Sequence, residues 1–249
     1  MNDTASNIAN PNSGPLAASV DVKAMFDRIA GRYDTANRVM SMGIDVLWRR
    51  QALATFAELP EAATFLDLGA GTLDGTAAIA ASRPGARVCA ADFAGQMLRA
   101  GSPKVRDTQA RVALHQADGH VLPYRDGVFD GVFTAFCVRN LVHLDVALAE
   151  LARVTRPGAK IAVLEFFRPV KPRWFFDGIY NRHILPLIGW AITGDRAAYQ
   201  YLPESIGRFD STHDFEARLR RAGFTSVSTK NLFPGAMASL ITATRGKPE

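Results

Sequence analysis

A glycine-rich segment after a short apolar run is the first feature of this sequence that could bind a ligand. It reads Asp67-Leu68-Gly69-Ala70-Gly71-Thr72-Leu73-Asp74-Gly75. Glycines after the first strand of an open α/β sheet let a ligand approach the backbone at the carboxyl ends of the strands. The spacing is GxGxxxG rather than the dinucleotide pattern GxGxxG, and Asp74 stands where the third glycine belongs. That carboxylate disfavours a pyrophosphate, so the segment predicts either a tight turn alone or a site for a ligand without phosphates.

Two further carboxylates follow the next two apolar runs. Asp92 is placed to accept hydrogen bonds from both hydroxyls of a ribose. Asp118 is placed to accept a hydrogen bond from the exocyclic amino group of an adenine. A single acidic residue in such a position is more often a helix cap or a solvated side chain. Asp67, Asp92 and Asp118 at three successive strand ends are harder to explain in that way. Together they predict a nucleoside pocket.

Short apolar runs alternate with helical stretches from residue 64 onward, and this alternation predicts the elements that position the carboxylates. Strands are expected at 65–68, 87–91, 112–116, 129–135 and 160–166, and helices at 76–81, 94–100, 145–154 and 215–222. Two consecutive strands, 226–232 and 238–244, follow without a helix between them. The pattern predicts an α/β fold with a mostly parallel sheet, helices on both sides and an antiparallel C-terminal hairpin at the edge.

Two segments fall outside this alternation. Residues 22–53 look helical and precede the first strand. Residues 168–206 interrupt the sheet pattern and carry seven aromatic residues, Trp174, Phe175, Phe176, Tyr180, Trp190, Tyr199 and Tyr201. Aromatic side chains of this kind either pack in an ordinary core or cover an apolar ligand and exclude water. We therefore expect a flexible arm at 1–20 and one domain at 21–249, with 168–206 as a helical insert or lid.

Composition excludes several classes of protein. The 249 residues are 48% hydrophobic, which excludes disorder throughout, and 29 Lys+Arg against 24 Asp+Glu give a net charge of +5. Cys89 and Cys137 show neither CxxC nor metal-ligand spacing, which predicts reduced thiols in a cytoplasmic protein and no metal site. No run approaches the roughly 20 apolar residues of a membrane span. The N-terminal residues do not have the pattern of a secretory signal.

The glycine loop with Asp92 and Asp118 resembles the class I S-adenosylmethionine-dependent methyltransferases. Four further stretches narrow the resemblance to the ubiquinone/menaquinone biosynthesis C-methyltransferases (UbiE type), over about residues 22 to 246. They are Phe26-Asp27-Arg28-Ile29-Ala30-Gly31-Arg32-Tyr33-Asp34 with Asn37, Met40-Ser41-Met42-Gly43-Ile44 with Leu47-Trp48-Arg49, Val138-Arg139-Asn140-Leu141, and Tyr199-Gln200-Tyr201-Leu202-Pro203-Glu204-Ser205-Ile206. The glycine loop is common to many methyltransferases, whereas these four stretches in this order are specific.

The resemblance implies a Rossmann-like class I methyltransferase fold and S-adenosylmethionine as cofactor. The implied reaction is methyl transfer to a ring carbon of a reduced polyprenyl quinone precursor. The cofactor-binding positions are then Asp67, Gly69, Gly71, Thr72, Asp92, Asp118 and Gly119. The candidate catalytic residues are Arg139, which can stabilise a developing phenolate or position a water, Asn140, which can orient a ring oxygen, and Tyr33, which can close the site. Without the resemblance, a surface ion pair for Arg139 and a core aromatic for Tyr33 are equally good interpretations.

Some features leave the acceptor open. Leu73 stands where the family usually has glycine, so the loop is expected to bend differently, and Ala135 replaces a common serine. The alternatives are a benzoquinol or a naphthoquinol, another lipophilic or phenolic small molecule, or a non-catalytic scaffold subunit that keeps the fold. No tyrosine has a lysine four residues later, as a short-chain reductase would need, and no nucleic-acid methyltransferase tetrapeptide is present.

The resemblance also suggests partners. The acceptor would be a lipophilic quinol, and Arg168, Lys171, Arg173 and Arg182 could rest on lipid headgroups at the inner face of a membrane. A homodimer or a quinone-biosynthesis complex is a further candidate. Nucleic acid is not an expected partner.

Overall fold

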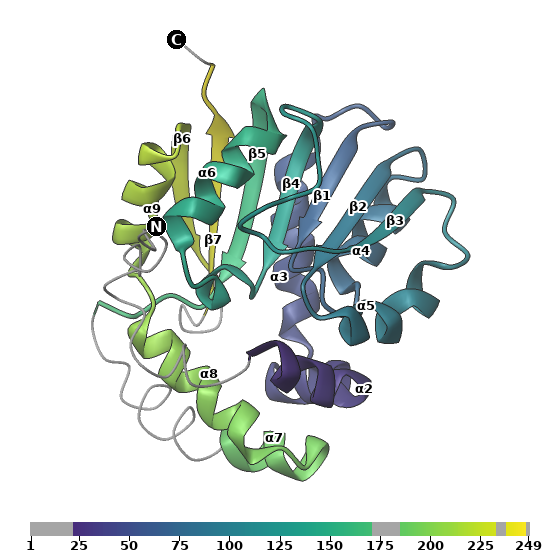
Figure 1. The fold of residues 1–249 in the computed structure, drawn as a ribbon, viewed down its shortest axis with the longest axis vertical. Helices are drawn as coiled ribbons and strands as arrows, with labels where there is room; N and C mark the ends of the chain where they lie inside the picture. The colour runs from purple at the N-terminus through teal and green to yellow at the C-terminus, as the bar shows by residue number, and fades with distance from the viewer. Residues whose placement is uncertain (1–21, 171–184, 233–237, 248–249) are drawn as a thin grey trace, which may run out of the picture.

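The computed structural model describes residues 22–170, 185–232 and 238–247, and a seven-stranded sheet in the order β3-β2-β1-β4-β5-β7-β6 forms its centre (Figure 1). The strands are β1 (Thr64–Leu68), β2 (Arg87–Asp92), β3 (Arg111–Gln116), β4 (Phe129–Ala135), β5 (Thr155–Glu165), β6 (Phe224–Asn231) and β7 (Ser239–Arg245). Strands β1 to β5 pair in parallel, whereas β7 is antiparallel to both β5 and β6. The predicted fold class and the C-terminal hairpin at the sheet edge are confirmed.

Helices cover both faces of the sheet because each has one apolar side. On one face α6 (Leu144–Val154) and α9 (Thr212–Arg221) pack into a core cluster with the strands. On the other face lie α3 (Ile44–Leu53), α4 (Asp74–Ser82) and α5 (Gly95–Gly101). Strand β5 lies between the two layers, and Ile161 to Leu164 are fully buried, as expected for a parallel strand covered on both sides.

The start of β5 differs from the prediction. Helix α6 ends at Val154 and the strand begins at once at Thr155, five residues before the predicted 160. Pro157 favours an extended conformation at Arg156, and Gly158 has a φ of 84°. The pairing register therefore jumps from Phe129↔Thr155 to Gly131↔Lys160. The Pro-Gly pair makes an irregularity inside the strand, three residues after the helix has already ended.

Three helices form a cap at the end of the molecule where β1, β2 and β4 have their carboxyl ends (Figure 1). They are α2 (Val22–Met40), α7 (Leu185–Thr193) and α8 (Arg196–Arg208). Helix α2 packs against α5 and α7, and α8 contacts the short 3-10 helix η3 (Val138–Asn140). The predicted N-terminal helical segment is confirmed, with a break at Ser41 to Gly43 between α2 and α3.

Part of the predicted insert can be compared with the structure. Residues 185–193 and 196–208 are helical, as predicted, whereas the arm at 1–20 and insert residues 171–184 lie outside the described residues. Among the helices of the described ranges, none has the length and apolarity needed to cross a membrane.

Candidate functional site

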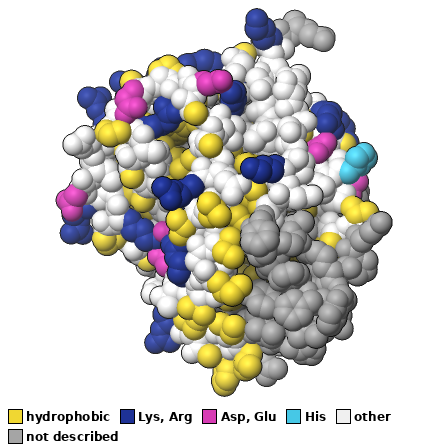
Figure 2. Space-filling model, turned by 180° about the vertical axis from the view of Figure 1, so that it is seen from behind, with side chains coloured by type: hydrophobic (Ala, Val, Ile, Leu, Met, Phe, Trp, Pro, Cys, Tyr) yellow, Lys and Arg dark blue, Asp and Glu magenta, His cyan; other side chains and the backbone are white. Residues whose placement is uncertain are grey.

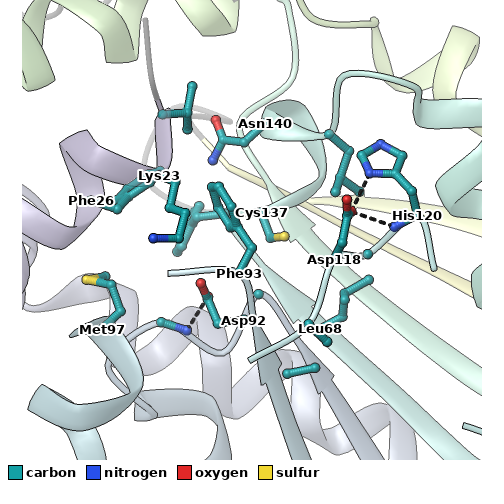
Figure 3. Close-up of a pocket in the computed structure, with 18 of the residues that line it drawn as sticks. Lys23, Phe26, Leu68, Asp92, Phe93, Met97, Asp118, His120, Cys137 and Asn140 are labelled. Carbon is teal, nitrogen blue, oxygen red and sulfur yellow. Dashed lines mark hydrogen bonds and ion pairs between the residues drawn. The ribbon is translucent and has the colours of Figure 1, made fainter. Parts of the chain in front are cut away.

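A cavity of about 340 Å³ lies between the carboxyl ends of the strands and helix α2 (Figure 3). Its walls include seven of the ten residues singled out in the sequence: Tyr33, Gly69, Gly71, Asp92, Asp118, Gly119 and Asn140. Asp67, Thr72 and Arg139 do not line it. The topology has therefore brought residues spread over more than one hundred positions of the chain to one place.

The glycine loop bends through left-handed backbone conformations. Gly69 and Gly71 have φ values of 69° and 52°, and Leu73 has a φ of 66° although it is not a glycine. Leu73 is fully buried against Leu98 and Val105, so its packing offsets the strain of this conformation. Leu73 thus adopts a φ that suits the glycine usual in the family, and the expectation that leucine changes the bend stays a prediction.

Close packing explains why Gly69 cannot carry a side chain. A Cβ at this position would collide with Sγ of Cys137, which lines the same cavity. Burial and the negative charges of Asp92 and Glu165 raise the pKa of the Cys137 thiol. Cys137 is therefore a neutral part of the wall.

Asp92 ends β2 and has both carboxylate oxygens bound to backbone donors. Gly71 N donates to Oδ2 and Ala94 N donates to Oδ1, each at 2.8 Å. The side chain is nearly buried, and burial raises its pKa while these N–H groups oppose the rise. The carboxylate retains lone pairs toward the cavity, which it can offer to ligand hydroxyls.

Asp118 is paired with a histidine that the sequence analysis did not select. His120 Nδ1 lies 2.5 Å from Asp118 Oδ1, and His120 N donates to the same oxygen at 2.9 Å (Figure 3). The backbone N–H of His143 donates to His120 Nε2 at 3.2 Å, so Nδ1 carries the proton in this arrangement. Partial burial raises the pKa of Asp118, but the contacts from His120 outweigh it and the pKa lies below its ordinary value.

Asp67 and Thr72 lie behind the loop. The Thr76 hydroxyl donates to Asp67 Oδ2 at 2.6 Å, and complete burial raises the pKa of Asp67 to about 6. Thr72 donates its hydroxyl to Asp34 of α2. In this structure both side chains hold the loop from outside the cavity.

Asp74 belongs to a charge network between the loop and the N-terminal helices. Lys104 Nζ lies 2.6 Å from Asp74 Oδ1 and 2.5 Å from Asp34 Oδ2, and Arg38 Nη2 lies 3.6 Å from Asp74 Oδ2. Burial alone would raise the pKa of Asp74, but the nearby cations have the larger, opposite effect. The pKa therefore lies below its ordinary value. The carboxylate in place of a third glycine therefore ties the loop to α2.

Arg139 is held in an internal ion pair with Glu165. Its Nη1 contacts Glu165 Oε1, and its Nε donates to Ser205 Oγ at 3.2 Å. The Arg139 side chain is 6% exposed and that of Glu165 is 0% exposed. Burial raises the pKa of Glu165, and the guanidinium offsets part of this rise.

Asn140 and Tyr33 line the cavity from two different elements, η3 and α2. Tyr201 of α8 donates its hydroxyl to Asn140 Oδ1 at 3.0 Å. Tyr33 of α2 packs edge-on against Phe26, with ring centroids 6.0 Å apart, and burial raises the pKa of its phenol. Figure 3 shows Lys23 and Phe26 reaching in from α2, with Asp118 and His120 on the far side.

The cavity lining fits S-adenosylmethionine. Two carboxylates, Asp92 and Asp118, accompany apolar walls that include Phe93, Met97 and Leu141. Carboxylates suit ribose hydroxyls and an adenine amino group, and the apolar walls suit the adenine rings. Sequence reasoning missed the apolar residues, although Phe93 directly follows Asp92. In the described part of the chain, no group of three or more His, Cys, Asp or Glu side chains is placed to hold a metal ion.

The ubiE/COQ5 methyltransferase family matches residues 16–244. The chain belongs to this family. The ubiquinone/menaquinone biosynthesis C-methyltransferase UbiE of Syntrophotalea carbinolica is 39% identical over 231 residues, which cover 92% of this chain and 95% of that protein. The demethylmenaquinone methyltransferase of Thermus thermophilus is 40% identical over 204 residues, or 81% and 91% of the two chains. Membership of the ubiE/COQ5 family confirms the resemblance and makes this chain an S-adenosylmethionine-dependent methyltransferase.

Solved structures share the fold of this ubiE/COQ5 family member at low sequence identity. The CurJ carbon methyltransferase is 17% identical with a TM-score of 0.63, over 88% of this chain and 59% of that chain. Phosphoethanolamine N-methyltransferase 2 of Haemonchus contortus, solved with S-adenosyl-L-methionine, is 14% identical with a TM-score of 0.58, over 80% and 53%. These similarities confirm the class I methyltransferase fold.

Proposed function

We propose that this protein methylates a ring carbon of a reduced polyprenyl quinone precursor, either demethylmenaquinol or 2-polyprenyl-6-methoxy-1,4-benzoquinol. One observation carries the proposal: a single cavity is lined by the carboxylates Asp92 and Asp118, by apolar residues that include Phe26 and Val142, and by Asn140. One relative is named for ubiquinone and menaquinone biosynthesis and the other for demethylmenaquinone. The apolar lining and the Asn140 amide suit an acceptor with an apolar body and a polar ring edge.

The residues of this chain position the acceptor rather than attack it. When bound, S-adenosylmethionine supplies an electrophilic methyl group on its sulfonium. A quinol becomes a carbon nucleophile when a hydroxyl loses its proton, because the electrons then reach the neighbouring ring carbon. Asn140 is placed to orient a ring oxygen, and Phe26 gives the cavity wall an apolar part. Holding two reactants in this way lowers a barrier by about 7–11 kcal/mol.

Product analysis tests the proposed function. The purified full chain is incubated with S-adenosylmethionine and each quinol under reducing conditions, and products are identified by mass spectrometry. Calorimetry first establishes cofactor binding, which a scaffold subunit could retain without transfer. We expect a mass gain of one methyl group in at least one quinol. Cofactor binding without methylation of either quinol would contradict this acceptor class.

We propose that the cap also meets a membrane surface. Hydrophobic side chains gather toward the end of the molecule where α2 and α7 lie (Figure 2). Met42 is 73% exposed at a φ of 52°, and Leu187 and Trp190 of α7 are 62% and 51% exposed. Of the four basic residues predicted to rest on headgroups, Arg168 is exposed and pairs with Asp214 at 3.3 Å, while the other three lie outside the described residues.

Vesicle co-sedimentation tests the membrane proposal. The double variant Met42→Ser/Trp190→Ser should bind anionic phosphatidylglycerol vesicles more weakly than the wild type. The matched control is Val146→Ser on α6, which removes an exposed apolar side chain of a different helix. Equal binding by all three proteins would exclude the cap as the contact surface.

Three further predictions remain proposals. We propose one domain over residues 21–249 with 168–206 as its lid, supported by the packing of α7 on α2 and of α8 on η3. Limited proteolysis with and without cofactor tests the lid, since closure should protect it.

A homodimer or quinone-biosynthesis complex on the cytoplasmic face of the membrane is testable by light scattering and cell fractionation.

A further inference from the structure

Helix α8 contacts two neighbouring residues at the carboxyl end of β4. Tyr201 donates its hydroxyl to Asn140 Oδ1 at 3.0 Å, and Arg139 Nε donates to Ser205 Oγ at 3.2 Å. Tyr201 and Ser205 are four residues apart, so they lie on the same side of the helix. One side of α8 therefore fixes two consecutive side chains of η3.

Glu165 supplies the buried counter-charge for this arrangement. Besides the Arg139 guanidinium, Glu165 Oε1 accepts the backbone N–H of Phe166 at 2.8 Å. The guanidinium also lies over the Phe166 ring, 5.9 Å from its centroid. Because these partners occupy Arg139 and it does not line the cavity, its charge is directed into the protein.

The hydrogen bond from Tyr201 determines which end of the Asn140 amide faces the cavity. The carbonyl oxygen accepts from Tyr201, which leaves the NH2 group as the donor on the cavity side. Figure 3 shows the amide nitrogen turned toward the centre of the site. A donor there stabilises a ring oxygen that gains negative charge as its proton leaves.

We propose that Tyr201, Ser205 and Glu165 are positioning residues for methyl transfer. Tyr201 fixes the Asn140 amide with its NH2 toward the ring oxygen of the acceptor, while Ser205 and Glu165 fix Arg139 as the link between α8 and β5. Asn140, rather than Arg139, is then the polar group of η3 that touches the acceptor. This inference rests on the proposed function, because it concerns the acceptor side of that site.

Tyr201→Phe is the sharpest variant, because it keeps the ring in its buried cluster with Met25 and Ile29 and removes only the hydroxyl. The amide can then turn its oxygen toward the acceptor, so kcat should fall roughly 10- to 100-fold. The dissociation constant of S-adenosylmethionine should stay within about twofold, because Asp92 and the glycine loop are untouched. The matched control is Tyr124→Phe, which removes a hydroxyl bonded to His115 at 2.7 Å outside the cavity.

Asn140→Asp removes the NH2 donor on the cavity side but keeps an oxygen that can accept the hydrogen bond from Tyr201. The carboxylate can still accept from Tyr201 but cannot donate to a ring oxygen, so kcat should fall at least as far as in Tyr201→Phe. An unchanged kcat in either folded variant would overturn the inference. A loss of cofactor affinity as large as the loss of kcat would overturn it too.

Arg139 needs a paired variant, because Arg139→Ala leaves the buried carboxylate of Glu165 without its counter-charge and can unfold the protein. Arg139→Gln/Glu165→Gln removes both charges and keeps polar groups in place. A positioning role predicts that this pair keeps kcat within about tenfold of the wild type, whereas an Arg139 that acts on the acceptor predicts a loss of 100-fold or more. Ser205→Ala should lower kcat less than Tyr201→Phe, and Glu204→Gln on the exposed side of α8 serves as its control.

Hydrogen exchange distinguishes a failure of this inference from a failure of the proposed function. In Tyr201→Phe, the backbone amides of η3 and α8 should exchange faster than in the wild type, while those of Tyr124→Phe at η3 should not change. This readout does not depend on the acceptor. If the wild type methylates neither quinol, the acceptor class is wrong, and unchanged exchange in Tyr201→Phe would still overturn the positioning role.

Discussion

The backbone N–H of Gly71 donates to the Asp92 carboxylate at 2.8 Å, so the end of β2 holds the loop that follows β1. The strands are neighbours in the sheet, with Leu68 paired to Ala91 directly before the loop and the carboxylate. A single side chain therefore shapes the glycine loop and faces the cavity. Loop conformation and ligand recognition are coupled through Asp92.

Replacing Asp92 should weaken cofactor binding. Asp92→Ala removes a charged acceptor and releases Gly71, and a hydrogen bond to a charged group contributes about 1.5–3 kcal/mol. We expect the dissociation constant of S-adenosylmethionine to rise roughly 10- to 100-fold, measured by calorimetry. Asp107→Ala, at an exposed aspartate, is the control. Unaltered affinity in Asp92→Ala would remove Asp92 from the cofactor site.

Replacing Leu73 should destabilise the fold without changing the loop. Leu73→Gly relieves a left-handed conformation that costs about 1–2 kcal/mol in a leucine. It also removes a fully buried side chain, and Leu→Ala changes at such sites cost about 2–5 kcal/mol. The net loss should be about 1–3 kcal/mol in urea unfolding, with cofactor affinity preserved. A more stable variant would show that backbone strain outweighs packing here.

Most of the sheet could be predicted from sequence because each strand has a recognisable local sequence pattern. Runs such as Phe129–Ala135 are apolar, are bounded by turn residues and carry β-branched or aromatic side chains, and this strand was predicted with its observed ends. The carboxylate Asp92 was also placed correctly at the cavity, since parallel strands bring their carboxyl ends to one edge.

Contacts between distant segments could not be predicted. Arg139 lies 26 residues from Glu165 and Asn140 lies 61 residues from Tyr201, and no local pattern says which side chains meet. The sequence placed Arg139 at the right edge, but it could not show that its guanidinium turns inward to Glu165. His120 differs, because its partner Asp118 is only two residues away and the pair could have been considered.

The contact between α2 and the loop should control how often the cap opens. Asp34→Asn removes one of the two carboxylate partners of Lys104, and a partly exposed pair of this kind contributes about 0.5–1 kcal/mol. Amide exchange in α2 should accelerate about two- to fivefold as a result. Asp126→Asn, which weakens an exposed pair with Arg153, is the control and should leave α2 unchanged. The same exchange rate in both variants would show that Asp34 does not hold the helix.

Asp67 should make stability depend on pH in a direction opposite to that of most carboxylates. Its pKa is raised from 3.8 to about 6 by burial, so between these values the folded state binds more protons than the unfolded state. The free energy of unfolding therefore decreases as pH rises through this window, and the penalty is complete above pH 6, at about 3 kcal/mol. Below pH 4 both states are protonated and the penalty vanishes.

Asp67→Asn isolates this contribution, because the amide oxygen can still accept from the Thr76 hydroxyl but cannot ionise. Relative to the wild type, the variant should gain little at pH 4 and up to about 3 kcal/mol at pH 7. Urea unfolding of both proteins at several pH values between 4 and 8 measures the difference, which cancels the titration of all other groups. A difference that stays constant with pH would mean that Asp67 has an ordinary pKa in the folded protein. Hydrogen bonds from donors other than Thr76 would then offset the effect of burial on this pKa.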